Sequence, residues 1–211
     1  MPDVFAQMQK DLYDGNAAEV KAATEQALED GSTPEEILSE GLVAGMDIVG
    51  RDFRAGDLFI PEVLIAAKAM HAGMNVLRPL LTQSEASGRG KVVIGTVAGD
   101  LHDIGKNLVS MMLEGGGFEV IDLGTDVKPE TFIENLQSEG AGLLGMSALL
   151  TTTMPQMKNT IEALQAAGIR DQIKVMVGGA PVTEDFAKDI GADAYASDAA
   201  EAVDKARALI A

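Results

Sequence analysis

From residue 92 onward, short apolar runs alternate with amphipathic stretches, and this alternation constrains the fold more than any other feature. The apolar runs span residues 92–97, 120–123, 143–146 and 175–177, with a weaker candidate at 194–196. Strands that alternate with helices pair in parallel and are covered by helices on both faces. Five strands in about 120 residues predict an α/β domain of flavodoxin-like (Rossmann-like) architecture, with a five-stranded parallel sheet in the order 2-1-3-4-5.

The residues before this region carry helical signals instead. Thr33 and Glu36 have the spacing of a capping box, with Pro34 at the first helical position, and Asn16 is placed to cap an earlier helix. Apolar residues recur at three- and four-residue steps along each stretch. We expect four helices packed as a small bundle, over residues 3–14, 16–30, 34–54 and 61–81.

The two patterns are separated by residues 82–90, which are small or polar and show no periodicity. This composition is typical of a linker. The sequence therefore predicts a helical cap domain at 1–82, a linker at 83–90 and an α/β domain at 91–211.

Composition excludes several kinds of protein. The chain has no cysteine, which removes thiolate metal sites, iron–sulfur clusters and disulfides, and a reducing cytoplasm is the simplest location. A net charge of −17 argues against binding to nucleic acid or to an anionic membrane. We also expect no signal peptide and no membrane span, because no long apolar run occurs.

Unusual residues gather where a parallel sheet of this order binds ligands, beyond the carboxyl ends of its first and third strands. The first strand runs into residues 100–105, the third ends in residues 146–153, and the fourth ends in residues 178–181. One of only two histidines, His102, lies here, two residues after Asp100. A metal-binding imidazole usually donates its other N–H to a carboxylate. One histidine is too few for a protein-only zinc site, but it suffices as the axial ligand of a metal held in a macrocycle.

These residues resemble the signature of cobalamin-dependent methyl-transfer proteins, which pairs Asp-x-His-x-x-Gly with a later Ser-x-Leu and a Gly-Gly on a flavodoxin-like domain. The helical half strengthens the resemblance, because residues 45–50, Phe53, Gly56 and residues 59–64 are similar to the helical cap of the same family. In the α/β half the signature comprises Asp100, His102, Gly105, Ser147, Leu149, Gly178 and Gly179.

The resemblance implies cobalamin bound base-off and His-on, with its own lower base displaced and His102 as the axial ligand of cobalt. Asp100 would accept a hydrogen bond from the imidazole, and Thr153, where relatives have serine, would donate to Asp100. The displaced nucleotide tail would enter a slot beside the first strand, at Gly95, Ala98 and Gly99. The residues implied in binding the cofactor are Asp100, His102, Asp103, Ile104, Gly105, Ser147, Leu149, Thr151, Gly178 and Gly179, with Phe59 and Met70 of the cap as apolar contacts.

By the same resemblance the chain is a corrinoid protein of methanogenesis or acetogenesis on methylamines, betaines or methoxylated compounds, and it also resembles the cobalamin-binding module of methionine synthase. It would be a carrier subunit, not a complete enzyme. It would receive a methyl group from a substrate-specific methyltransferase and pass it to an acceptor methyltransferase that uses tetrahydrofolate or coenzyme M. Cobalt would cycle between methyl-Co(III) and Co(I), with a reductive activase as a further partner. The sequence does not identify the methyl donor.

Two other functions share parts of the pattern. Cobalamin-dependent sensors have the same two-domain unit, but they usually add a basic DNA-binding region and a cap tryptophan, and this chain contains no tryptophan. The small subunit of a cobalamin-dependent mutase shares Asp-x-His-x-x-Gly but typically lacks the helical cap. Taken alone, Asp-x-His at the end of a strand would be read as a simple turn.

Overall fold

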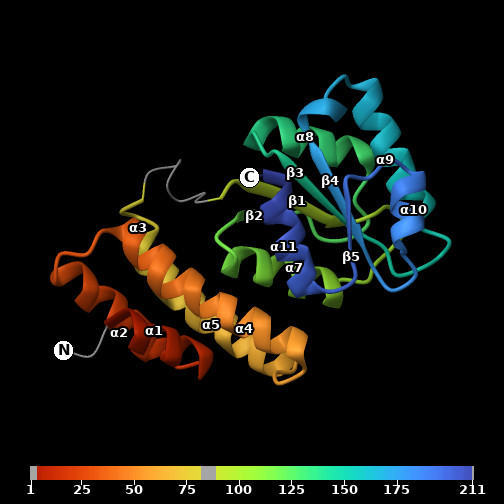
Figure 1. Cartoon of the computed structure of the whole chain (residues 1–211). Coiled ribbons are helices and arrows are strands. Elements are labelled where there is room, and N and C mark those ends of the chain that lie inside the picture. The colour runs from red at the N-terminus through yellow and green to blue at the C-terminus, as the bar shows by residue number, and fades with distance from the viewer. Residues whose placement is uncertain (1–3, 82–88, 211) are drawn as a thin grey trace. The chain divides into compact units, whose positions relative to one another are not determined.

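The computed structural model describes residues 4–81 and 89–210 and divides into two compact units (Figure 1). The helical unit covers Met1–Gly88 together with Glu114–Gly117, and the α/β unit covers Arg89–Leu113 and Phe118–Ala211. Most of the predicted linker, at 83–90, lies outside the described residues. None of the helices in the two described ranges combines the length and apolarity that a membrane span requires.

Four successive helical segments build the helical unit, as predicted. They are α1 (Val4–Tyr13), α2 (Ala17–Glu29), a composite helix, and α5 (Ile60–Leu77). The composite helix consists of α3 (Pro34–Glu36), a π-helical stretch η1 (Ile37–Val43) and α4 (Ala44–Ala55). Helix α1 packs on α2 and α4, and α2 packs on α5. The fully buried side chains that form their shared core include Met8, Leu12, Val20, Ile37, Leu42 and Leu77.

The helix ends agree with the sequence only in part. The capping box is confirmed: the N–H of Glu36 donates to Thr33 Oγ1 at 3.2 Å, and the N–H of Thr33 donates to Glu36 Oε2 at 2.9 Å. The predicted cap at Asn16 is wrong, because that side chain accepts no helix N–H and instead donates to Asp11 Oδ1 at 3.4 Å. Helix α5 ends at Leu77, four residues earlier than the predicted end at residue 81.

The α/β unit is a five-stranded parallel sheet in the order β2-β1-β3-β4-β5, which confirms the predicted topology. Helices α8 and α9 lie over one face of the sheet, and α7 and α11 lie over the other (Figure 1). The strands are β1 (Lys91–Thr96), β2 (Glu119–Asp122), β3 (Leu143–Ser147), β4 (Lys174–Gly178) and β5 (Ala194–Ala196). The helices are α7 (Ile104–Gly115), α8 (Pro129–Glu139), α9 (Pro155–Ala166), the short α10 (Glu184–Asp189) and α11 (Ala199–Ile210). A 3₁₀ turn, η2 (Arg170–Gln172), precedes β4.

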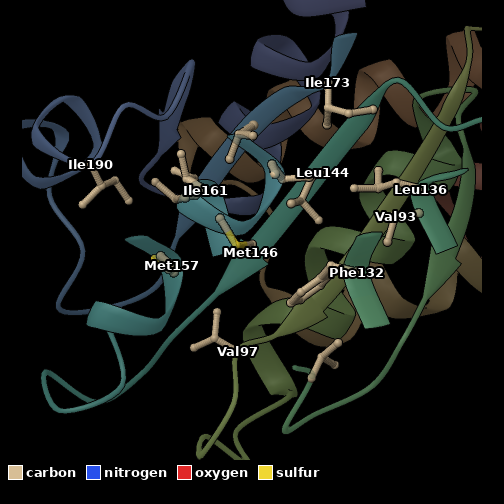
Figure 2. Close-up of a cluster of buried hydrophobic side chains, with 14 of the residues drawn as sticks. Val93, Val97, Phe132, Leu136, Leu144, Met146, Met157, Ile161, Ile173 and Ile190 are labelled. Atoms are coloured by element: carbon tan, nitrogen blue, oxygen red, sulfur yellow. The ribbon is translucent and has the colours of Figure 1, made fainter. Parts of the chain in front are cut away.

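Apolar side chains fill the space between the sheet and helices α8 and α9 (Figure 2). Phe132 of α8 is fully buried against Val93 and Val97 at β1, and Met157 and Ile161 of α9 lie in the same cluster. Burial of a side chain of this size stabilises the fold by about 1.5–3 kcal/mol. This packed layer holds β1 and β3 in place, and with them the loops that follow the two strands.

Candidate functional site

The loop after β1, residues 97–103, lies where the order of the strands reverses. Strand β1 pairs with β2 on one side and with β3 on the other, and the following helices cover opposite faces of the sheet. Loops at such a point diverge and leave room for a ligand beyond the carboxyl ends of the strands. The loop after β3, which contains Leu149 and Leu150, comes to the same edge.

Asp100 joins these two loops through a carboxylate that accepts five hydrogen bonds. Its Oδ1 accepts from the N–H of His102 at 3.2 Å and from His102 Nδ1 at 2.7 Å. Its Oδ2 accepts from the N–H groups of Leu149 at 2.8 Å and Leu150 at 3.2 Å, and from Thr153 Oγ1 at 2.7 Å. The side chain of Asp100 is fully buried, so all of its acceptor capacity is met by protein groups.

This environment keeps Asp100 ionised. Burial by itself would raise the pKa of the carboxyl, but the hydrogen bonds from Thr153, from the His102 ring and from the backbone of Leu149 and His102 outweigh it. The pKa of Asp100 is therefore held well below its usual range. A carboxylate in this state can only accept hydrogen bonds, so His102 Nδ1 carries the ring proton.

His102 presents its other ring nitrogen outward. Its side chain is 52% exposed, whereas its partner Asp100 is fully buried. The backbone of the same residue is held by Thr96, whose Oγ1 donates to His102 O at 2.8 Å. With the proton on Nδ1, the lone pair of a neutral imidazole lies on Nε2, and Nε2 has no hydrogen-bond partner among the residues that the structure describes. The arrangement is that of a metal-binding imidazole oriented by a carboxylate.

Large apolar side chains around His102 are exposed. Leu101 is 74% exposed and Ile104 is 80% exposed, and Leu149 and Leu150, whose N–H groups bind Asp100, are also exposed. At Gly105 a Cβ would meet no atom within 4 Å, so the space above the first turn of α7 is open. Contiguous exposed apolar side chains mark binding surfaces. A large, flat, mostly apolar ligand that is bound at one nitrogen fits this surface.

The other predicted site residues differ in what holds them. Asp103 lies at the start of α7, where its Oδ2 accepts from Asn107 Nδ2 at 3.1 Å. Thr151 is exposed in the turn before α9. Ser147 pairs in register with Gly178, so the ends of β3 and β4 lie side by side. Gly179 has a φ of +131°, and a Cβ there would lie 1.9 Å from the carbonyl oxygen of Ala148, so the protein's own backbone requires this glycine.

The predicted role of Gly95 in a slot for the nucleotide tail is wrong. A Cβ at Gly95 would lie 2.8 Å and 2.9 Å from ring atoms of Phe132, and 3.0 Å from Val127. The missing side chain therefore makes room for Phe132 of α8. The face of the strand to which Gly95 points could not be read from its sequence neighbours. By contrast, a Cβ at Gly99 would meet only the methyl group of Thr153, at 3.7 Å.

The two predicted residues of the helical unit also differ. Phe59, which precedes α5, is 67% exposed, whereas Met70 in the middle of α5 is buried. Of the two, Phe59 has the free surface that a contact with a large cofactor needs. Ile60 and Leu64 of α5 are also exposed.

A second polar cluster lies at the end of the neighbouring strand β2. Lys106, in the first turn of α7, is only 2% exposed, and its Nζ donates to Asp122 Oδ2 and, at 2.6 Å, to Asn107 Oδ1. Asp122 also accepts from Ser110 Oγ at 3.3 Å and from the N–H of Gly124 at 2.8 Å. This ion pair ties the beginning of α7, and with it Gly105, to the sheet.

Across the described ranges, no group of three or more histidine, cysteine, aspartate or glutamate side chains is arranged to hold a metal ion. A metal bound at His102 therefore needs further ligands from a molecule other than the protein.

Comparison with known proteins agrees with this geometry. Residues 90–204 match the family described as B12 binding domain, and residues 4–78 match a second family with the same description. The chain belongs to the B12-binding family. This chain is 50% identical over 179 residues to dimethylamine corrinoid protein 1 of Methanosarcina acetivorans, a match that covers 84% of each protein. It is 48% identical over 196 residues to trimethylamine corrinoid protein 1 of the same organism, covering 92% of this chain and 89% of that one.

Solved structures agree in fold over almost the whole chain. The methanol:cobalamin methyltransferase complex MtaBC from Methanosarcina barkeri contains a chain with 32% identity and a TM-score of 0.89, a match that covers 99% of this chain and 80% of that one. A cobalamin-binding protein from Desulfitobacterium hafniense DCB-2 has 31% identity and a TM-score of 0.81 over the full length of both. The helical unit followed by the parallel-sheet unit is thus the architecture of these corrinoid proteins.

Proposed function

We propose that this protein carries a methyl group on a bound corrinoid between two methyltransferases, with His102 as the axial ligand of the cobalt. The observation that carries the proposal is the half-exposed imidazole of His102, whose Nδ1 lies 2.7 Å from the ionised, buried Asp100 and whose Nε2 points away from protein partners. The identity to methylamine corrinoid proteins supports the carrier function.

The residues present fit a corrinoid. Leu101, Ile104, Leu149 and Leu150 offer exposed hydrocarbon to a macrocycle, and the open space at Gly105 admits its edge without a clash. At or just after the strand ends, where the displaced tail would lie, the chain has Gly99, Ser147, Thr151, Gly178 and Gly179. When bound, the corrinoid supplies a cobalt centre that accepts a methyl group from one partner and gives it up to another.

The protein contributes orientation and a place for a proton. Asp100 holds the ring of His102 in one tautomer, so that Nε2 is the nitrogen available to a metal. Nε2 is thus the ring nitrogen left to bind a metal or a proton, while the proton on Nδ1 stays on the hydrogen bond to Asp100. Thr153 Oγ1 donates to the other carboxylate oxygen and so keeps the charge of Asp100 in place.

Partners are part of the proposal. We expect a substrate-specific methyltransferase to load the protein, because relatives are named for dimethylamine and trimethylamine and one solved relative is a complex with a methanol:cobalamin methyltransferase. An acceptor methyltransferase that uses tetrahydrofolate or coenzyme M, a reductive activase and a cytoplasmic location stay predictions. The names of these relatives favour a carrier over the sensor and the mutase subunit.

The test is reconstitution of the apoprotein with hydroxocobalamin, followed by gel filtration and a visible spectrum. We expect wild type to retain the corrinoid and His102→Ala to lose most of it and to change the spectrum of the remainder. His71→Ala removes the other histidine of the chain, whose Nε2 lies 3.0 Å from Glu114 Oε2, and as the control it should keep the wild-type spectrum. Unchanged retention and an unchanged spectrum in His102→Ala would overturn the assignment of the ligand.

A further inference from the structure

The loop between β2 and α8 follows the end of β1 beyond the regular sheet. The N–H of Thr96 donates to Gly124 O at 2.9 Å, and the N–H of Val127 donates to Thr96 O at 2.9 Å. Val97 and Val127 then form an isolated parallel bridge. These contacts bring residues 124–127 to the loop that carries Asp100.

Asp126 makes the last two contacts of this series. Its Oδ1 accepts from the N–H of Gly99 at 2.7 Å, and its own N–H donates to the carbonyl oxygen of Asp100 at 3.0 Å. Asp126 therefore binds the N–H of Gly99 and the carbonyl oxygen of Asp100, the two outer backbone groups of this pair of residues. Within the loop itself, the backbone bond that supports Asp100 is the one from its N–H to Val97 O, at 3.1 Å.

The backbone at this contact is in an unfavourable conformation. Asp126 has a φ of +55°, and no other non-glycine residue in the described ranges has a positive φ. Its partner Gly99 has a φ of +79°. A left-handed conformation outside glycine costs free energy and persists where the surroundings enforce it, often next to a functional site. Aspartate tolerates this conformation better than most residues, and here its short carboxylate reaches the N–H of Gly99.

We infer that Asp126 is a positioning residue that sets the orientation of Asp100, and through Asp100 the tautomer and direction of the His102 ring. The inference rests on the proposed role of His102 as the cobalt ligand. Ligand geometry must hold to about 0.5 Å to be productive. The five hydrogen bonds of the Asp100 carboxylate come from two loops, so a shift of its backbone changes all of them together. The two contacts of Asp126, together with the bond from the N–H of Asp100 to Val97 O, resist such a shift.

A purely structural role for Asp126 makes a different prediction, since it would change stability alone. Asp193 provides the comparison, because its Oδ2 also accepts a backbone N–H, from Val175 at 2.7 Å at the start of β4, and in addition pairs with Arg170 at 2.9 Å. Loss of that bond should destabilise the sheet without reaching His102.

The experiment compares Asp126→Gly, Asp126→Asn and Asp193→Ala with wild type. Asp126→Gly keeps the positive φ and removes the acceptor, whereas Asp126→Asn keeps both. In the apoproteins, ¹⁵N shifts of the two histidine rings report the tautomer, and His102→Ala assigns the signals. In the reconstituted proteins, the electron paramagnetic resonance spectrum of cobalt(II) reports axial nitrogen, and dialysis reports retention of the corrinoid.

We expect Asp126→Gly to mix the two tautomers of His102, to weaken the axial nitrogen signal and to retain the corrinoid about five- to tenfold less well, as for the loss of one hydrogen bond. Asp126→Asn should stay within about twofold of wild type on the same scale, and Asp193→Ala should lower only the stability. The inference is overturned if Asp126→Gly leaves the ring shifts and the cobalt signal unchanged, or if Asp126→Asn loses them equally. If wild type and His102→Ala give the same cobalt signal, the proposed ligand fails instead, and the apoprotein shifts still test Asp126.

Discussion

Two aspartates at the ends of adjacent strands, Asp100 after β1 and Asp122 in β2, organise the polar groups at this edge of the sheet in different ways. Asp100 is fully buried and its cationic or metal-binding partner, His102, is half-exposed. Asp122 is partly exposed and its partner, Lys106, is buried. In the first pair, protein groups occupy both oxygens of the carboxylate and hold the imidazole so that its Nε2 stays free of partners within the described parts of the chain. In the second pair the charged nitrogen is enclosed, so the pair serves the fold. The exposed partner, more than the ion pair itself, distinguishes a binding site from a structural contact.

The largest change in stability should follow from breaking the enclosed pair. Asp122→Asn leaves the ammonium of Lys106 buried without a counter-charge, which we expect to cost about 3–5 kcal/mol of unfolding free energy. Urea unfolding of the apoprotein measures it. Lys106→Met, which leaves the partly solvated Asp122 behind, is the control and should cost less. Equal losses in the two variants would show that burial of the lysine is not what makes this pair structural.

Asp100→Asn should affect the cofactor more than it affects the fold. The amide keeps the shape but loses the charge that orients His102, and substitutions of groups that orient a metal ligand typically lower metal affinity by about 10–100-fold. Retention of the corrinoid during dialysis gives the measurement, with Asp122→Asn as the matched variant from the neighbouring strand. Retention should fall further in Asp100→Asn than in the folded fraction of Asp122→Asn.

Removal of the hydroxyl that supports Asp100 should have a smaller effect. Thr153→Val deletes the hydrogen bond from Oγ1 to Asp100 Oδ2 without changing the size of the side chain, and we expect a loss of about 1–3 kcal/mol in stability because the bond is to a charged group. Thr153→Ser retains the hydroxyl and should restore both stability and corrinoid retention. A valine variant as stable as wild type would mean that the backbone N–H groups of Leu149 and Leu150 alone suffice.

The smallest effect should be the pH dependence of the unfolding free energy that Asp100 causes. Near neutral pH this dependence vanishes, because the carboxyl is ionised in both the folded and the unfolded chain. The pKa of Asp100 in the folded protein lies below its value of about 3.9 in an unfolded chain. The stability that its ionised form contributes is therefore complete above about pH 4 and is lost as the pH falls further, toward the folded pKa. The difference in unfolding free energy between wild type and Asp100→Asn should be largest above about pH 5 and should shrink as the pH falls from about 4 to 3. A difference that stays constant with pH would contradict the depressed pKa.

Much of this edge could be predicted from the sequence, because the change from a helical to a strand-and-helix pattern fixes which loops meet. The order of the strands follows from that pattern, and it brings Asp100 and His102 to Thr153, which lies about fifty residues further along the chain. The bond between Asp100 and His102 then follows from residue chemistry, whereas the role of Thr153 was implied by the resemblance to cobalamin-dependent methyl-transfer proteins.

What could not be predicted depends on register and packing. Gly95 faces Phe132 because of the side of the sheet on which α8 lies. Lys106 is buried because the first turn of α7 lies over the end of β2, and a lysine in an amphipathic pattern gives no sign of this. The contact between Asp126 and Gly99 depends on the positive φ of Asp126, which no sequence motif predicts. Asn16 makes no side-chain cap on α2, and its amide nitrogen donates to Asp11 instead.

The most direct test of the central claim is the electron paramagnetic resonance spectrum of the cobalt(II) protein made with ¹⁵N-labelled histidine and unlabelled corrinoid. An axial ¹⁴N nucleus splits the cobalt lines into triplets, and an axial ¹⁵N nucleus splits them into doublets. If His102 Nε2 is the axial ligand, labelling converts triplets into doublets, His71→Ala leaves the doublets unchanged, and His102→Ala abolishes them. Triplets that persist in the labelled protein would show that the corrinoid keeps its own lower base on cobalt, and would contradict the role assigned to His102.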